Sequence, residues 1–112
     1  MTRVPEAGDV YRISPCGAGH ELAGPHYAVV VSEDAYNELS TVVVVPFSTG
    51  ARRYSWRVGV RIKGKLSLAL TDQVRAVDKS LLRECVGVLP TEAFAQVRYR
   101  LSELLGLDAT LF

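Results

Sequence analysis

Two unbroken runs of β-branched residues most constrain what this chain can fold into. They are Tyr27–Ser32 (YAVVVS) and Thr41–Ser48 (TVVVVPFS), and neither alternates apolar with polar side chains. A strand with water on one face would show that alternation. Both runs are therefore predicted to be strands that are buried on both faces, as in a small barrel.

Residues 54–63 show the complementary pattern. Tyr54–Lys63 (YSWRVGVRIK) alternates with period two, which predicts a strand with one dry face and one basic face. Tyr54 and Trp56 fall in line with the apolar residues of the dry face. A core or dimer contact is therefore favoured for these two rings over stacking on nucleobases.

The remaining segments are predicted to be short. Strands are expected at Asp9–Ser14, Leu66–Leu70 and Cys85–Leu89, and an extended stretch at Asp72–Val77. Short helical turns are expected after Ser32 and after Asp78 or Ser80, whose side chains can cap them.

One amphipathic helix closes the chain. After Pro90, Thr91 is predicted to cap a helix of about four turns that stops at Gly106. Five or more strands and one helix predict a mainly β fold with a C-terminal helix (α+β), an SH3-like, partly open β-barrel.

A chain of 112 residues can bury one core but not two, so residues 1–112 are predicted to form a single domain. The longest apolar runs fall far below the roughly 20 residues that span a bilayer, and residues 1–9 lack the pattern of a secretory signal. A cytoplasmic location without a membrane partner is predicted.

Cys16 and Cys85 have no metal-ligand spacing, so two buried or half-buried thiols are favoured over a disulfide or a metal site.

Basic residues gather in the middle of the chain. Between Leu39 and Thr71 there is no Asp or Glu, although six of the 13 Lys and Arg residues lie there. These six are Arg52, Arg53, Arg57, Arg61, Lys63 and Lys65. The net charge of +1 thus hides an uneven distribution, and one face is predicted to attract polyanions.

Several short motifs occur in order along the chain. One opens it, one lies in the glycine-rich loop Cys16–Pro25, one follows that loop, and the others lie farther along, the last at the end of the predicted helix. They are Gly8–Tyr11 (GDVY), Gly19–Gly24 (GHELAG), Ala28–Ser32 (AVVVS), Val45–Thr49 (VPFST), Leu68–Lys79 (LALTDQVRAVDK) and Leu104–Leu107 (LLGL). In this order, over roughly residues 8–107, they resemble the MazF/PemK toxin family, the ribonuclease components of bacterial toxin–antitoxin pairs, and their number makes coincidence improbable.

The resemblance implies a barrel of the CcdB/MazF type that forms a homodimer. It also implies sequence-specific, metal-independent cutting of single-stranded RNA (mRNA, tRNA or rRNA), with inhibition of translation and growth and with no cofactor. Cutting RNA in this way means that the 2′-OH attacks its own phosphate, leaving 2′,3′-cyclic phosphate and 5′-OH ends. An antitoxin with an acidic C-terminal segment is the implied protein partner.

The resemblance also implies two catalytic positions. The family's threonine at the end of the third strand falls on Ser48, which keeps the hydroxyl, and its arginine before the second strand falls on His26. A histidine can shuttle protons near neutral pH better than an arginine but loses the permanent charge. His26 is therefore either a catalytic imidazole or a structural one.

Other residues are candidates for RNA binding, each with a plainer alternative. His20 and Glu21 lie in the glycine-rich loop, where the two histidines could form an acid–base pair or His20 could be idle. The remaining candidates are Thr49, Arg52, Arg53, Asp72 and Gln73. For Thr49 the alternative is a hydroxyl that simply ends a strand, and for Arg52 and Arg53 it is a solvated charge pair. For Gln73 it is a buried amide that ties strands together.

Two other classes of function compete with the nuclease. One is a non-catalytic inhibitor on the same fold, a CcdB-like gyrase poison. The chain ends DATLF, without the Trp-Gly-Ile type of ending associated with that group. The other is a plain RNA-binding barrel in which the change to His26 has abolished cutting.

Overall fold

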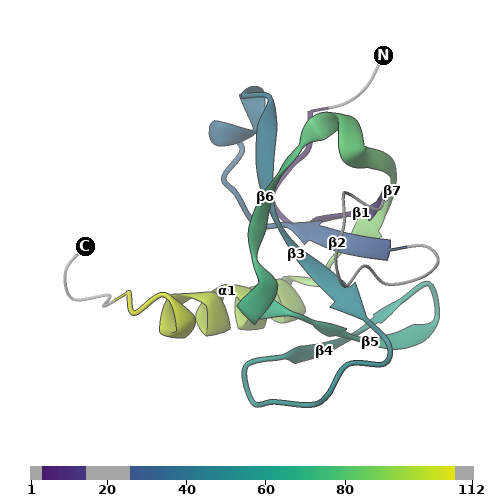
Figure 1. The fold of residues 1–112 in the computed structure, drawn as a ribbon, viewed down its shortest axis with the longest axis vertical. Coiled ribbons are helices and arrows are strands. Elements are labelled where there is room, and N and C mark those ends of the chain that lie inside the picture. The colour runs from purple at the N-terminus through teal and green to yellow at the C-terminus, as the bar shows by residue number, and fades with distance from the viewer. Residues whose placement is uncertain (1–3, 15–25, 108–112) are drawn as a thin grey trace.

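The computed structural model describes residues 4–14 and 26–107. These residues form one antiparallel sheet of seven strands, three single-turn 3₁₀ helices and one α-helix (Figure 1). The strands are β1 (Asp9–Ile13), β2 (His26–Val30), β3 (Thr41–Ser48), β4 (Val58–Ile62), β5 (Lys65–Ala69), β6 (Arg75–Asp78) and β7 (Leu82–Val88). The helices are η1 (Tyr36–Glu38), η2 (Thr71–Gln73), η3 (Lys79–Leu81) and α1 (Thr91–Leu104).

The sheet is curled, and α1 covers part of it. The strand order is β4-β5-β3-β2-β1-β7, with β6 also paired to β3. Helix α1 packs against β4 and η2, and Figure 1 shows it lying across one side of the curled sheet. The prediction of a mainly β, partly open barrel with a C-terminal helix is confirmed.

β3 is the strand on which the others assemble. One of its edges pairs with β2, and the other pairs first with β6, over Thr41–Val44, and then with β5, over Phe47–Ser48. Pro46 has no N–H to donate, and it lies where this second edge changes partner. Its carbonyl accepts a hydrogen bond from the Leu70 N–H at 2.8 Å. The change of partner leaves the end of β3 beside β5 and η2.

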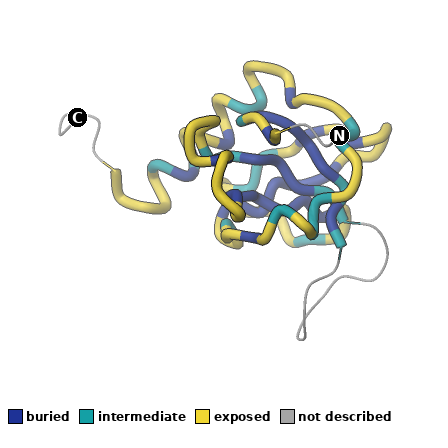
Figure 2. The backbone as a smooth tube through the Cα atoms, turned by 90° about the horizontal axis from the view of Figure 1, so that it is seen from above, coloured by how far each residue is buried: buried dark blue, intermediate teal, exposed yellow. Residues whose placement is uncertain are grey.

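The buried side chains of β2 and β3 alternate between two clusters, one on each side of the sheet. The first cluster contains Val29, Val45, Phe47, Val97 and Leu101, the last two from α1. The second contains Ala28, Val30, Val42, Val44, Tyr11, Ile13 and Val77. Because both faces are covered, the two strands need no polar alternation, and the prediction of strands buried on both faces is confirmed. Figure 2 shows the buried residues gathered along the strands and the exposed ones in the loops and the end of α1.

Truncating Val45 to alanine is expected to lower the free energy of unfolding by about 2 kcal/mol, since it removes two buried methyl groups and leaves a cavity. Val45 is 0% exposed, whereas Val88 on β7 is 65% exposed. The matched variant Val88→Ala should change stability by no more than about 0.5 kcal/mol. Urea unfolding of both variants measures the difference, and equal losses would show that the first cluster does not carry the fold.

The strand predicted at Tyr54–Lys63 is shorter in the structure, because β4 begins only at Val58. The alternation holds within β4, where Val60 and Ile62 are buried. Tyr54 and Trp56 precede it in a turn closed by the Arg57 N–H and the Tyr54 carbonyl at 3.0 Å. The core placement of the two rings was therefore wrong, because the period-two pattern continues into a turn, and the alternative of a dimer contact stays a prediction.

Several element ends also differ from prediction. Pro90, not Thr91, occupies the N-cap position of α1, and no side chain caps it. Asp78 does cap a turn, by accepting from the Ser80 N–H at 2.8 Å, but that turn is η3 and β7 already begins at Leu82. The extended stretch at 72–77 is divided into η2 and β6.

Ser32 has a different role from the predicted cap. Its hydroxyl accepts a hydrogen bond from the Val43 N–H at 3.0 Å and contacts the Asn37 amide oxygen. Asn37 is fully buried and donates to the carbonyls of Pro5 and Ser32, both at 3.0 Å. The Ser32 hydroxyl therefore helps to hold Asn37, and Asn37 ties the β2–β3 connection to the N-terminal segment. The helix η1 begins later, after Ala35.

Only one of the two cysteines, Cys85, lies among the residues that the structure describes. Cys85 is half-buried, as predicted, and its thiol donates to the Gly87 carbonyl at 3.5 Å. Cys16 lies outside the described residues. Within those residues, no helix is both long and apolar enough to pass through a bilayer.

Candidate active site

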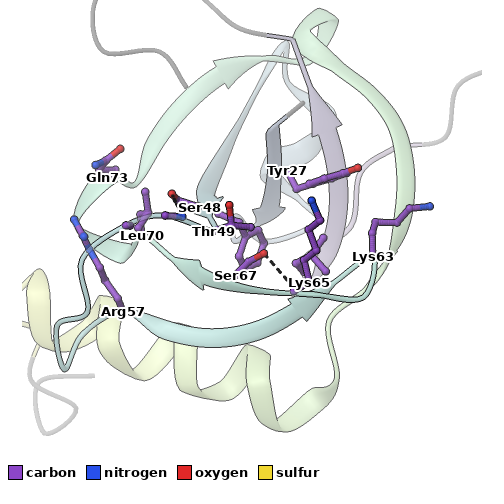
Figure 3. A pocket seen from close by; sticks show the side chains of 13 residues that line it. Tyr27, Ser48, Thr49, Arg57, Lys63, Lys65, Ser67, Leu70 and Gln73 are labelled. Atoms are coloured by element: carbon purple, nitrogen blue, oxygen red, sulfur yellow. Dashed lines mark hydrogen bonds between the residues drawn. The ribbon is translucent and has the colours of Figure 1, made fainter. Parts of the chain in front are cut away.

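A pocket of about 700 Å³ opens where β3 changes partner. Its walls come from the end of β3 and the loop after it, the start of β2, the β4–β5 hairpin and η2. In Figure 3, Arg57 and Gln73 stand at one side of the pocket and Tyr27 and Lys65 at the other, with Ser48 between them. Segments far apart in sequence thus supply one concave surface.

The lining of this pocket is cationic and rich in hydroxyl groups. Arg57, Lys63 and Lys65 line it, and none of its described lining residues carries a carboxylate. Hydroxyls come from Ser48, Thr49, Ser67 and Tyr27, and an amide from Gln73. Such a set of donors suits an anionic ligand such as a phosphate group.

Ser48 ends β3 and is buried, with 8% of its surface exposed. Its Oγ accepts a hydrogen bond from the Gly50 N–H at 3.3 Å. This bond uses a lone pair and fixes the side chain, so the hydroxyl hydrogen stays available for a group in the pocket.

Arg57 is the most constrained side chain of the pocket, and only 10% of its side chain is exposed. Its Nε and Nη2 donate to the two carboxylate oxygens of Asp72 at 3.0 and 2.9 Å. Its Nη1 donates to the Arg52 carbonyl at 2.8 Å, and its guanidinium lies 4.9 Å from the centre of the Tyr54 ring. A guanidinium has five N–H donors, so these bonds leave two for a ligand.

The pair also shifts both ionisation equilibria. The hydrogen bond from Arg57 holds the pKa of the Asp72 carboxyl below its usual value, against the desolvation that raises it. The same bond raises the pKa of Arg57. Both groups are therefore kept charged, and the pocket retains a permanent cation.

Replacing Asp72 by asparagine is expected to lower the free energy of unfolding near pH 7 by about 1–2 kcal/mol. Because the folded-state pKa of Asp72 is lowered, its contribution is present above the unfolded pKa and is lost as the pH falls through the folded value. The stability gap between the parent protein and Asp72→Asn should therefore close below about pH 4. Thermal unfolding across pH 2–7 measures it, and a gap that persists at low pH would contradict this linkage.

His26 begins β2 and is half-buried, paired with Ile13 of β1. The pairing of β2 with β3 runs from Val30–Val44 to Ala28–Pro46, so His26 lies two residues before the first paired residue of β2. His26 is not among the described residues that line the pocket, although its neighbour Tyr27 is. The structure therefore places Ser48 in the pocket and His26 next to a residue that lines it.

The structure brings some of the predicted RNA-binding residues together and separates others. Thr49 and Gln73 line the pocket with Ser48. Arg52 and Arg53 are exposed on the β3–β4 loop outside it. The Asp72 carboxylate is engaged by Arg57, while His20 and Glu21 lie outside the described residues.

Sequence reasoning did not single out the three pocket cations. Their signal was present, since all three belong to the acid-free stretch between Leu39 and Thr71. Lys63 and Lys65 reach the pocket because Lys63–Gly64 forms a two-residue hairpin turn with φ angles of 52° and 81°. Positive φ at both positions is typical of the type I′ turn. Among the described residues, no group of three His, Cys, Asp or Glu side chains is arranged to hold a metal ion.

Comparisons with known proteins agree with one another. A family model described as "PemK-like, MazF-like toxin of type II toxin-antitoxin system" matches residues 6–105. Rv3098A of Mycobacterium tuberculosis (strain ATCC 25618 / H37Rv), which is named as a candidate toxin, is 34% identical over 103 residues. That alignment covers 89% of this chain and 96% of the relative.

Solved structures show the same likeness. A crystal structure of MazF from Deinococcus radiodurans has a TM-score of 0.79 and 32% identity, covering 95% of this chain and 100% of that one. A MazE–MazF crystal structure from the same organism has a TM-score of 0.80 and 28% identity, with coverage of 95% and 100%. The likeness extends over nearly the whole of each chain.

Proposed function

Because the chain belongs to the PemK/MazF family of type II toxin–antitoxin toxins, which are generally endoribonucleases, we propose that it cuts single-stranded RNA in the pocket beside Ser48. The observation that supports this most directly is the pocket itself. Three cations line it, one of them Arg57 in its pair with Asp72, together with several hydroxyls, and its described lining residues include no carboxylate. This is the electrostatic character that a phosphodiester substrate needs.

The proposed reaction uses the substrate's own 2′-OH as the nucleophile, without a metal or a cofactor. The products are a 2′,3′-cyclic phosphate and a 5′-OH, in mRNA, tRNA or rRNA. Arg57 would stabilise the negative charge that develops on the phosphorane, and the Ser48 hydroxyl would donate a further hydrogen bond to it. His26, which begins β2 next to the pocket residue Tyr27, would move a proton to or from the reacting oxygens.

The same basic surface supports a proposal about partners. The related Deinococcus protein has been crystallised as a MazE–MazF complex. For this chain we propose an antitoxin whose acidic C-terminal segment competes with RNA for the pocket cations, together with a homodimer and a cytoplasmic site of action. Charge complementarity supports the first of these proposals.

Incubating the purified protein with mixed cellular RNA in excess EDTA, and mapping the new 5′ ends by sequencing, tests the reaction. Discrete 5′-OH ends that share a short motif are the expected result, and Ser48→Ala at the same concentration should produce them at least about a hundredfold more slowly. RNA left uncut by folded protein that still binds it would favour the plain RNA-binding barrel.

A further inference from the structure

Two aromatic side chains form a stack on the loop that joins β3 to β4. The rings of Tyr54 and Trp56 lie 4.6 Å apart between centroids, with an angle of 4° between their planes. Each residue is 37% exposed, and neither belongs to the two core clusters. Burial in the core therefore does not account for this pair, which we call the Tyr54–Trp56 stack.

The Tyr54–Trp56 stack is held in place by a hydrogen bond and by two guanidinium groups. The Trp56 carbonyl accepts a hydrogen bond from the Thr71 hydroxyl at 2.5 Å, and Thr71 is fully buried in η2. The guanidinium groups of Arg52 and Arg57 lie 5.3 and 4.9 Å from the centre of the Tyr54 ring. A surface that is already ordered loses little conformational entropy when a ligand binds to it.

The surroundings of the stack are basic. Arg52, Arg53 and Arg57 belong to the same loop, and the acidic neighbour Asp72 is bound to Arg57. Exposed aromatic rings next to guanidinium groups are the combination with which proteins hold unpaired nucleobases, since the rings stack on the bases and the cations hold the phosphates.

The stack also adjoins the pocket along the chain. Residues 49–51 at the start of the loop line the pocket, and so does Arg57 directly after Trp56. Because Arg57 lines the pocket and its guanidinium lies 4.9 Å from the centre of the Tyr54 ring, a single strand with a phosphate at Arg57 would have a neighbouring base next to the stack. We infer that the Tyr54–Trp56 stack is a base-stacking subsite for an unpaired nucleobase next to the phosphate in the pocket. This inference rests on the proposed function.

Trp56 is the only tryptophan of the chain, so its fluorescence reports on the stack directly. The probe is a short single-stranded RNA with methylated 2′-hydroxyls, which blocks the proposed cutting, and inorganic polyphosphate is the polyanion without bases. We expect saturable quenching by the RNA and none by polyphosphate. Equal quenching by both, or no quenching by RNA that binds, would overturn the subsite.

The variant Trp56→Leu should bind the methylated RNA about 5- to 150-fold more weakly, and Trp56→Phe should recover part of this loss. Its binding of polyphosphate should stay unchanged, because no charge is removed. Tyr36→Leu, which removes a ring with 66% exposure on η1, is the matched control and should bind RNA like the parent protein. Parent-like RNA affinity in Trp56→Leu, with or without a change of oligomeric state, would overturn the subsite.

The EDTA cleavage assay separates the two proposals. Base-dependent quenching by a protein that cuts no RNA would support the subsite and contradict the nuclease. Cleavage by Trp56→Leu with parent-like rate and affinity would contradict the subsite and leave the nuclease in place.

Discussion

Replacing Arg57 by glutamine is expected to lower the rate of RNA cleavage about a hundredfold or more. The loss follows from the position of this guanidinium, which lines the pocket, is held by Asp72 and the Arg52 carbonyl, and has two N–H donors that these bonds do not use. Arg57→Lys keeps the charge but cannot form the two-pronged bond to Asp72, so it should recover only a small part of the activity. Initial rates on a defined RNA measure both variants.

Two controls separate catalysis from folding in this experiment. The double variant Arg57→Gln/Asp72→Asn removes both charges and leaves no unpaired carboxylate, so it should unfold closer to the parent temperature and remain inactive. Arg61→Gln removes an arginine of β4 that does not line the pocket, and it should cut like the parent protein. Near-parent cleavage by the folded double variant would show that the pocket cation does not act on the phosphate.

Replacing His26 by alanine is expected to lower cleavage at least about a hundredfold, the range for loss of a general acid or base. If the imidazole moves a proton, free imidazole added to His26→Ala should restore part of the rate. The same addition should do nothing for Ser48→Ala, which lacks a hydrogen-bond donor to the phosphate and should lose a similar factor. Ser48→Thr keeps the hydroxyl and should remain active.

The outcomes assign His26 clearly. Loss of activity with imidazole rescue supports proton transfer, whereas loss without rescue, accompanied by a lower unfolding temperature, would make it a structural residue that joins β1 and β2. Full activity in His26→Ala would remove it from the mechanism.

The barrel was predictable because the sequence carries its strongest signal where burial is greatest. The runs of valine in β2 and β3 could be interpreted correctly since only a strand covered on both faces tolerates them. The start of β4 was not predictable, because Tyr54 and Trp56 kept the period of the strand while the Thr71 hydroxyl and the Asp72–Arg57 pair held them in a turn. Those partners lie about 15 residues away in sequence, beyond what a local pattern can show.

The candidate site was predictable only in part for the same reason. Ser48, Thr49 and Gln73 were found through a resemblance of motifs, and the structure places all three on one pocket. Arg57 carries no motif, and its importance depends on the carboxylate that fixes it. A pattern can show that a segment is basic, but only tertiary contacts show which of its cations is held still.

The pairing of β1 with β7 has a consequence for how the molecule is made. Asp9 pairs with Val88 and Ile13 with Leu82, so β1 can be covered on this edge only after the much later strand β7 has been synthesised. Pairings between such distant residues form slowly, because closing the long loop between them lowers the conformational entropy of the chain before any stabilising contact is made. A nascent chain that ends before Leu82 lacks one neighbour of β1, leaving Tyr11 and Ile13 without part of their cover. The sheet is therefore completed only once the residues up to Val88 are free to pair with β1, so a nascent chain gains this edge of the sheet late, after the six other strands have been made.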